Sequence, residues 1–469
     1  MADVYIVYSN RDDTAPEAAG HLAAALAPRW TVFWDDLIVG DFVDAIEREM
    51  ADAGCIIPIW SSGARKSESV RDELAIAKRL HVTMIPVKVE DCDAPYGYGQ
   101  LSAVDLRGWK GESDHPRYQQ LLRKLSSIVP PKAKPVRPAT VAGGALKLPA
   151  VFFSVSSYET HLTPLEAVSA LRIFGAQTVL ISAYDLLPAR RPKKIIPALS
   201  QLHRQGAYIV VDSGNYEAYR RADKTWTADD LKPALAGIPY NMAFSFDIMR
   251  PPADALRAAK QIVTAARCDE ERIGRAVSPI VHAPRSNGRY RVECLPDIVY
   301  YVADHLQPML VAVPERELGP GLIASARTVQ RIRKKLDELP FYQPLHLLGT
   351  GNPWSIAILA AAGADSFDGL EWCRVVADGS TRRLYHSQHF DFFAYQARVS
   401  ASPVTSAAVD DARVDFAGKV ALHNLDVLSD FNAELRTSAE KSGLEALVRE
   451  LLGTDNVRQL KAQMPELFE

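Results

Sequence analysis

The fold of the N-terminal part is decided by residues 55–75, CIIPIWSSGARKSESVRDELA. Residues 55–60 are an apolar run typical of a buried strand, and residues 70–80 have a helical pattern. The serine-rich stretch between them places a carboxylate, Glu73, in the first turn of that helix. Open α/β sheets bind ligands at this point, just past the end of a strand. The alternative is that Glu73 only complements the helix dipole.

Composition limits the classes of protein that the chain can belong to. Its 469 residues suffice for two or three domains, and 48% hydrophobic with 24% charged residues indicates a globular protein. No apolar run approaches the roughly 18 residues of a membrane span, and no signal peptide is apparent. Five cysteines without CxxC spacing favour free thiols, so we expect a cytoplasmic protein without membrane contact. The net charge of −3 argues against non-specific coating of nucleic acid, although it leaves room for a local basic groove.

Strand and helix patterns alternate strictly through residues 1–129, which we take as the first domain. Strands are expected at residues 4–8, 30–34, 55–60 and 81–89. Helices are expected at residues 16–27, 42–53, 70–80 and 118–128. This alternation predicts a parallel sheet covered by helices on both faces, in a flavodoxin-like arrangement.

Three segments of this domain resemble, in order and spacing, the Toll/interleukin-1 receptor (TIR) family. Residues 5–9 (YIVYS) with the acidic turn that follows are similar to the opening strand of that family. Residues 33–40 (FWDDLIVG) are similar to its BB loop. Residues 62–74, with Ser67 and the Glu73–Leu74 pair, are similar to its third motif.

The resemblance implies either an adaptor or an enzyme that cleaves NAD at the nicotinamide–ribose bond. In the enzymes the glutamate of the third motif is catalytic, which assigns this role to Glu73. A carboxylate there either stabilises the oxocarbenium ion that forms on the ribose or orients the ribose hydroxyls, and NAD is a substrate, so no cofactor is expected. The residues assigned to the wall of the NAD cleft are Tyr8, Ser9, Trp34, Asp36 and Ser67, and the alternative for each is an ordinary loop or rim residue.

Two further implications follow from the TIR resemblance. The BB loop of one copy completes the cleft of its neighbour in the enzymes of this family, so we expect a homo-oligomer on activation. Val70 stands where the family usually carries an aromatic residue that stacks on the substrate.

Residues 130–147 contain four prolines and a glycine pair without apolar periodicity, which predicts a linker. Residues 148–396 then alternate strand and helix patterns again, with the size and rhythm of a (β/α)8 barrel. The expected strands are residues 150–158, 178–184, 208–214, 242–249, 276–283, 309–315, 345–351 and 365–370. Active sites of such barrels lie at the carboxyl ends of the strands. The polar or glycine residues found there are Asp212, Ser213, Asp247, His282, Glu315, Gly349, Gly351 and Asp368.

Three of these strand ends resemble the tRNA-guanine transglycosylase family. Residues 211–217 (VDSGNYE) are similar to its Asp-Ser-Gly-Gly-Phe-Gln motif, and residues 244–247 (FSFD) to the strand that recognises the base. Residues 346–368 resemble the segment that ends in the nucleophile. The resemblance implies that Asp212 is a base-recognising or general-base carboxylate. It likewise implies that Asp247 holds the guanine edge and that Asp368 is the nucleophile.

The sequence departs from the transglycosylase family after the nucleophile. The family's zinc cluster of several cysteines and a histidine is absent, with only Cys373 nearby, so no metal site is expected. One interpretation is that the barrel has lost base exchange and uses its pocket to bind a nucleobase, nucleotide or nucleic acid. The other is that the barrel is an active base-exchanging enzyme. Basic clusters at residues 190–194, 285–291 and 382–383 either contact phosphates or are solvated loops.

Residues 397–469 begin with small residues and continue with helical patterns at 416–428, 434–452 and 457–464. They predict a small α-helical appendix that serves oligomerisation or binds a partner. The whole chain favours a TIR NAD⁺ glycohydrolase or ADP-ribosyl cyclase that is regulated by a transglycosylase-like sensor in anti-phage defence. The alternatives are a base-exchanging transglycosylase with the TIR domain as scaffold, or two non-catalytic binding modules.

Overall fold

The computed structural model describes residues 2–11, 13–34, 50–112, 115–131, 135–158 and 160–468. The chain folds into two compact units. Unit 1 comprises Met1–Arg137 and Asp337–Tyr342, and unit 2 comprises Pro138–Leu336 and Gln343–Glu469.

Unit 1 contains a parallel sheet with the strand order β2-β1-β3-β5-β6, and β4 also pairs with β3. The strands are β1 (Val4–Val7), β2 (Val32–Phe33), β3 (Cys55–Trp60), β4 (Thr83–Met84), β5 (Val87–Lys88) and β6 (Val104–Asp105). The helices are α1 (Thr14–Leu26), α3 (Ser62–Lys66), α4 (Glu68–Arg79) and α5 (Pro116–Ser126). The predicted parallel α/β sheet is confirmed. Most of the helix expected at residues 42–53 lies outside the described residues.

Two boundaries in unit 1 differ from the prediction. The strand expected at residues 81–89 is divided into β4 and β5, because Pro86 between them has no N–H with which to continue the ladder. Helix α4 begins at Glu68, since the hydroxyl of Ser67 caps it by accepting from the backbone N–H of Val70 at 3.3 Å. Glu73 therefore lies in the second turn of the helix, not in the first.

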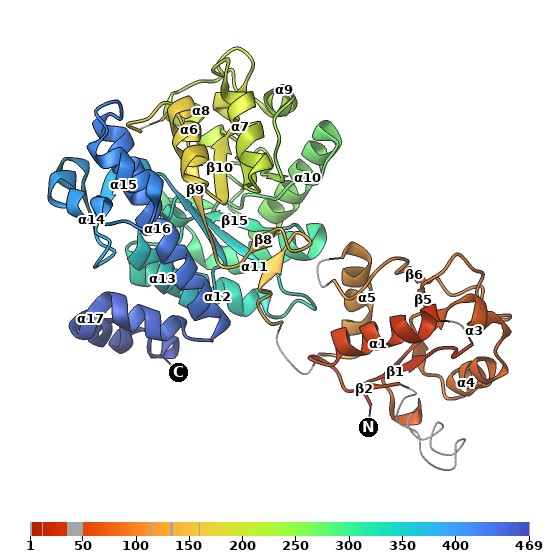
Figure 1. The fold of residues 1–469 in the computed structure, drawn as a ribbon. Coiled ribbons are helices and arrows are strands. Elements are labelled where there is room, and N and C mark those ends of the chain that lie inside the picture. Colours follow the sequence, from red (N-terminus) through yellow and green to blue (C-terminus); the bar gives the residue numbers. More distant parts are fainter. Residues whose placement is uncertain are drawn as a thin grey trace. The chain divides into compact units, whose positions relative to one another are not determined.

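Unit 2 is built around a curled parallel sheet with the strand order β12-β11-β10-β9-β17-β16-β15 (Figure 1). The strands are β9 (Ala150–Val155), β10 (Thr178–Ser182), β11 (Tyr208–Asp212), β12 (Met242–Ala243), β15 (Val311–Pro314), β16 (Leu345–Leu348) and β17 (Ser366–Gly369). Alternate residues face opposite sides of this sheet. Phe152 belongs to the apolar cluster inside the barrel, whereas Phe153 packs in the cluster formed with the outer helices.

The two edges of the sheet are joined through residues 278–281. Parallel bridges pair Phe244 with Ser278 and Ile280 with Ala312, so this segment occupies the fifth position of the ring. It was expected to form a regular strand over 276–283. Pro279 interrupts the hydrogen-bond ladder there, which explains why only isolated bridges form.

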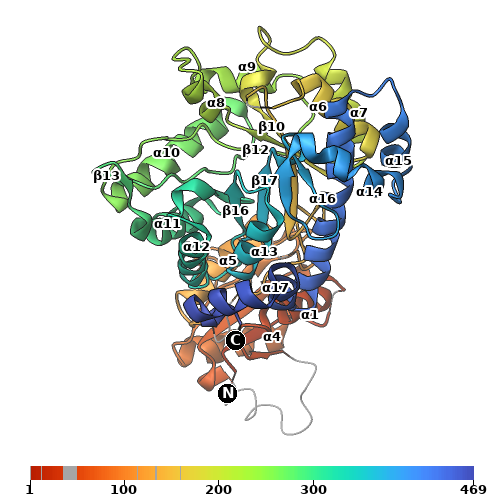
Figure 2. The same ribbon diagram turned by 90° about the vertical axis from the view of Figure 1, so that its left-hand side faces the viewer.

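Helices follow the strands and cover the outside of the barrel. They include α6 (Pro164–Phe174), α7 (Ile195–Arg204), α8 (Asn215–Arg220), α10 (Ala255–Ile273), α11 (Leu295–Leu306), α12 (Leu322–Leu336) and α13 (Pro353–Ala361). Figure 2 shows α10 to α13 outside strands β12, β16 and β17. The carboxyl ends of the strands are left for the loops and short 3₁₀ turns that carry the polar residues.

The segment predicted as a linker, residues 130–147, is partly structured. Strands β7 (Thr140–Val141) and β8 (Leu146–Lys147) form an antiparallel hairpin within it. Val141 and Leu146 are buried in the same apolar cluster as Phe152 and Tyr208 of the barrel strands. Burial of these two side chains makes the hairpin part of unit 2.

The predicted C-terminal helical region is confirmed, and its helices belong to unit 2 together with the barrel. Helix α16 (Phe416–Glu440) runs beside α6 and β9 in Figure 1, and its Leu422 and Leu425 lie in the outer cluster of the barrel. The side-chain amide of Asn424 donates to the carbonyls of Trp372 and Val375, at 2.9 and 2.6 Å. The helices expected at 416–428 and from 434 are therefore one helix up to Glu440, which is followed by α17 (Leu444–Gln463).

Among the residues that the structure describes, no helix is both long enough and apolar enough to cross a membrane.

Candidate functional site

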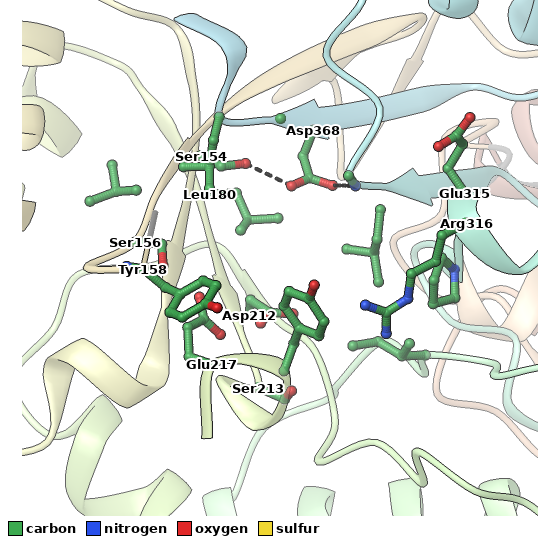
Figure 3. A pocket seen from close by; sticks show the side chains of 18 of the residues that line it. Ser154, Ser156, Tyr158, Leu180, Asp212, Ser213, Glu217, Glu315, Arg316 and Asp368 are labelled. Carbon is green, nitrogen blue, oxygen red and sulfur yellow. Dashed lines mark hydrogen bonds between the residues drawn. The ribbon is translucent and has the colours of Figure 1, made fainter. Parts of the chain in front are cut away.

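A cavity of about 290 Å³ opens at the carboxyl ends of the barrel strands (Figure 3). Its wall takes residues from β9, β11, β17 and the loops after β12, β15 and β16. The charged residues of the wall are Asp212, Glu217, Asp247, His282, Glu315, Arg316, Asp368, Glu371 and Arg374. The cavity is rich in carboxyl groups, so it favours a ligand that presents N–H groups over an anion.

Asp368, at the end of β17, is held by donors on both of its carboxylate oxygens. Its Oδ2 accepts from the hydroxyl of Ser154 at 2.6 Å, and its Oδ1 accepts from the backbone N–H of Gly349 at 2.9 Å. His346 Nε2 lies 3.3 Å from Oδ1. These contacts fix the carboxylate in one orientation at the cavity wall, as a nucleophile requires.

A second hydrogen-bonded group contains the side chains of Asp247, Ser213, His282 and Glu317. The Ser213 hydroxyl donates to Oδ1 of Asp247 at 2.7 Å, and His282 Nε2 lies 2.6 Å from Oδ2. The other ring nitrogen, Nδ1, lies 2.9 Å from Oε1 of Glu317. All four side chains are buried.

The charges within this group support one another. Burial disfavours the imidazolium, but the hydrogen bonds and charges of Asp247 and Glu317 outweigh it and raise the pKa of His282 to about 9. Burial likewise opposes ionisation of Asp247, but the hydrogen bond and charge of His282 prevail and lower the pKa of Asp247. The group therefore consists of an imidazolium clamped between two carboxylates.

Asp212 and Glu217 come from the end of β11 and from α8. Burial, followed by the charges of Glu217 and Asp247, raises the pKa of Asp212 well above its usual value. Burial also raises the pKa of Glu217 to about 6. Glu217 can therefore give or take a proton near neutral pH, which suits acid–base catalysis on a nucleobase.

The Asp-Ser-Gly turn needs its glycine. Gly214 has a φ of +73°, and a Cβ there would lie 2.4 Å from the backbone nitrogen of Tyr184. Its N–H donates to Oδ2 of Asp212 at 3.0 Å. The turn therefore aims Asp212 into the cavity while Ser213 reaches Asp247.

Seven of the eight residues predicted at the strand ends line one cavity, namely Asp212, Ser213, Asp247, His282, Glu315, Gly349 and Asp368. Gly351 contributes indirectly, because a Cβ at this position would lie 1.8 Å from Oε2 of Glu371. Sequence reasoning missed Glu371 and Glu317. Each lies a few residues beyond a strand end, and that position was the only signal for either of them.

In unit 1, Glu73 is half-buried on α4, where it flanks the buried stripe of Val70, Leu74 and Ala77. Ser67 caps the same helix, about 9 Å earlier along its axis. Its hydroxyl also lies 2.9 Å from that of Ser69.

The other residues predicted for the NAD cleft lie at the end of β1 and after β2. The rings of Tyr8 and Trp34 are 6.2 Å apart. The hydroxyl of Ser9 accepts from the N–H of Arg11 at 3.2 Å, and Arg11 Nη1 donates to the carbonyl of Lys66 at 3.5 Å. The turn after β1 therefore lies beside the start of α4. Asp36 falls outside the described residues.

The residues after Asp368 do not fit a zinc site. Burial raises the pKa of the Cys373 thiol to about 12, and Sγ donates to the carbonyl of Leu370 at 3.3 Å. A zinc ligand has to be a thiolate, which this environment disfavours. Within the described part of the chain, no three His, Cys, Asp or Glu side chains are grouped to hold a metal ion.

Comparison with known proteins supports both resemblances. Residues 4–122 match the model of the TIR domain family. The chain is also similar to the tRNA-guanine(15) transglycosylases of Methanothermobacter thermautotrophicus (24% identity, covering 59% of this chain and 43% of the relative) and Methanopyrus kandleri (25%, 50% and 50%). A third relative with the same name, from Haloferax volcanii, is 22% identical over 70% of this chain and 64% of its own. The chain spans about half the length of the curated relatives it matches. It therefore consists of an N-terminal TIR domain fused to a tRNA-guanine transglycosylase-like barrel.

Proposed function

We propose that unit 1 is an NAD⁺ nucleohydrolase and that the barrel of unit 2 senses a ligand and controls it, in anti-phage defence. The observation that carries the proposal is the position of Glu73 in a TIR domain. It is half-buried on the helix that follows the third strand of a parallel sheet, beyond the carboxyl end where such sheets bind nucleotides.

The reaction needs little more than a fixed negative charge. The bond between C1′ of the ribose and the nicotinamide nitrogen breaks, and its electron pair leaves with nicotinamide as a neutral base. Glu73 stabilises the resulting ribose cation. Water then adds to C1′ and releases a proton, giving ADP-ribose, or a ring nitrogen of the adenine adds and gives the cyclic product.

The barrel supplies the control element in this proposal. Its cavity combines carboxyl groups that donate or accept a proton with the aromatic side chains of Tyr158 and Tyr216, which suits a flat nucleobase, free or within a nucleotide or nucleic acid. Binding would shift the protein towards an assembly of TIR domains in which the clefts are complete. Homo-oligomerisation and NAD cleavage would then rise together.

The test uses the purified full-length chain with NAD. Nicotinamide and the ADP-ribose products are followed by chromatography, with and without guanine, deazaguanine bases or phage nucleic acid. We expect turnover that rises with one of these additions and with the oligomer fraction. Absence of NAD cleavage under every condition, including forced clustering of the TIR domain, would contradict the proposal.

A second candidate function is base exchange on nucleic acid by the barrel. The observation in its favour is the fixed carboxylate of Asp368, which Ser154 and Gly349 orient at the cavity wall. In this reaction Asp368 bonds to C1′ of a nucleoside, and the old base departs with the electron pair of its bond to C1′ and a proton from the neutral carboxyl of Asp212. The incoming base then bonds to C1′, displaces Asp368 and returns its N–H proton to Asp212. Incubation with labelled guanine and tRNA or DNA distinguishes this candidate by incorporation of label.

A further inference from the structure

Glu371 lies in the turn after β17, three residues beyond Asp368, and it lines the barrel cavity. Its Oε2 is shielded from solvent and has no hydrogen-bond partner among the described residues. By contrast, Asp368 and Asp247 have a donor on each of their oxygens. Glu217 is another cavity carboxyl with such an oxygen, because its Oε2 also has no hydrogen-bond partner among the described residues.

Two glycines make room for this side chain. A Cβ at Gly351 would lie 1.8 Å from Oε2 of Glu371, and a Cβ at Gly369 would lie 2.2 Å from it. Neither glycine has the positive φ that would require glycine for backbone reasons. A Cβ at Gly369 would also lie 2.6 Å from Cα of Gly351, so backbone packing requires a glycine there as well. At Gly351 the three nearest atoms all belong to Glu371, so this glycine provides the space for the Glu371 carboxyl.

This environment favours the neutral carboxyl. Burial raises the pKa of Glu371 to about 7, although a hydrogen bond from its own backbone N–H opposes this shift. The charged groups that act on it are Asp368 of β17 and Glu315 after β15, which favour the neutral form, and Arg374, which opposes it. Glu371 lines the cavity, so its carboxyl is within reach of a ligand bound there.

We propose that Glu371 is a specificity-determining residue of the barrel, whose neutral carboxyl donates a hydrogen bond to an acceptor atom of a nucleobase in the cavity. The assignment rests on the proposed role of the barrel in binding a base. A carbonyl oxygen or ring nitrogen of the base is the acceptor. Deprotonation replaces this donor with a second acceptor and weakens binding.

Equilibrium dialysis of the full-length protein with radiolabelled guanine, between pH 6 and pH 8.5, tests the assignment. For the wild type we expect affinity to fall as pH rises, approaching tenfold for each pH unit above the pKa of Glu371. Glu371→Gln keeps an N–H donor that does not titrate, so its affinity should stay near the low-pH value. Glu371→Ala should bind roughly tenfold more weakly at low pH. Glu450→Gln, on the exposed face of α17, is the control and should behave as wild type.

The possible outcomes distinguish the role of Glu371 from the base-binding role of the barrel as a whole. If the wild type binds guanine and Glu371→Gln shows the same dependence of affinity on pH, the role of Glu371 is wrong. The base-binding role of the barrel would still stand. Failure of the wild type to bind guanine at any pH would overturn that role and the assignment with it. NAD cleavage by unit 1 is measured separately and is not decided by either result.

A double-mutant cycle of thermal stability tests the packing of Glu371 against Gly351. Gly351→Ala should lower the thermal midpoint because its Cβ displaces Glu371, and the double variant with Glu371→Ala should recover most of the loss. Gly99→Ala is the control, since a Cβ at Gly99 meets nothing within 4 Å. Additive effects of the two substitutions would contradict the proposed packing.

Discussion

Nε2 of His282 lies 2.6 Å from Oδ2 of Asp247, and both side chains are buried. The resemblance to transglycosylases assigned Asp247 to the edge of the bound guanine. Its Oδ1 accepts from Ser213 as well, so both of its oxygens already have a partner inside the protein. Each of these oxygens keeps a second lone pair for a ligand in the cavity, and Asp247 also serves to hold His282 in its charged form.

The clamp of His282 between Asp247 and Glu317 should be essential for folding of the barrel. His282→Leu leaves two buried carboxylates without their cation, so we expect a loss of about 3–5 kcal/mol in the free energy of unfolding. Urea unfolding followed by fluorescence and circular dichroism measures it. His305→Leu, at an exposed position, is the control and should stay within about 0.5 kcal/mol. A small effect of His282→Leu would show that the charges are compensated elsewhere.

The clamp also predicts how stability depends on pH. The pKa of His282 is raised from 6.5 to about 9 in the folded chain. Protonated His282 contributes its full stabilisation to the free energy of unfolding below pH 6.5. This contribution is lost as the pH rises through 9, where folded His282 loses its proton. On the order of 3 kcal/mol should disappear over this window in the wild type. The difference between wild type and His282→Gln, measured from pH 6 to pH 9.5, isolates it. A difference that does not change with pH would contradict a charged His282.

Asp368 should be required for any base exchange but not for folding. Asp368→Asn keeps the shape and removes the nucleophile, so incorporation of labelled guanine into tRNA or DNA should fall at least about 10³-fold. Ser154→Ala removes only one orienting hydrogen bond and should cost about tenfold. Equal losses in the two variants would argue against a nucleophilic Asp368.

Glu73 should be required for NAD cleavage. Glu73→Ala removes the charge that stabilises the ribose cation, so turnover should fall by about 10²- to 10³-fold or more. Its stability should change by less than about 1 kcal/mol, because the side chain is only half-buried. Glu68→Ala, on the exposed face of the same helix, is the matched control and should keep full turnover. Unchanged turnover in Glu73→Ala would refute the assignment.

The apolar periodicity of the sequence was sufficient to predict the two parallel sheets and most of the helices that cover them. Strand β3 lies where its apolar run predicted, and the alternation of patterns gave the parallel order of both units. The errors fall where local chemistry acts against a pattern. Pro86 and Pro279 interrupt predicted strands, and the cap at Ser67 starts α4 earlier than its apolar residues suggested.

The extent of the barrel unit was the part that sequence patterns described least well. The hairpin of β7 and β8 was hidden in a proline-rich stretch, and α16 was predicted as part of an appendix. Both pack into barrel clusters through a few apolar residues, Val141 and Leu146 in one case and Leu422 and Leu425 in the other. A short apolar pair does not reveal which distant surface will bury it.

The strand patterns predict which residues stand at the ends of the strands, because a parallel barrel brings those ends to one face. Which of their atoms are already paired follows from the folded chain alone. His282 is paired with Asp247 and Glu317, whereas Oε2 of Glu371 packs against Gly351 without a hydrogen-bond partner among the described residues. Hydrogen bonds and burial between residues far apart in the chain set these states, and neither is encoded in the spacing of a single motif.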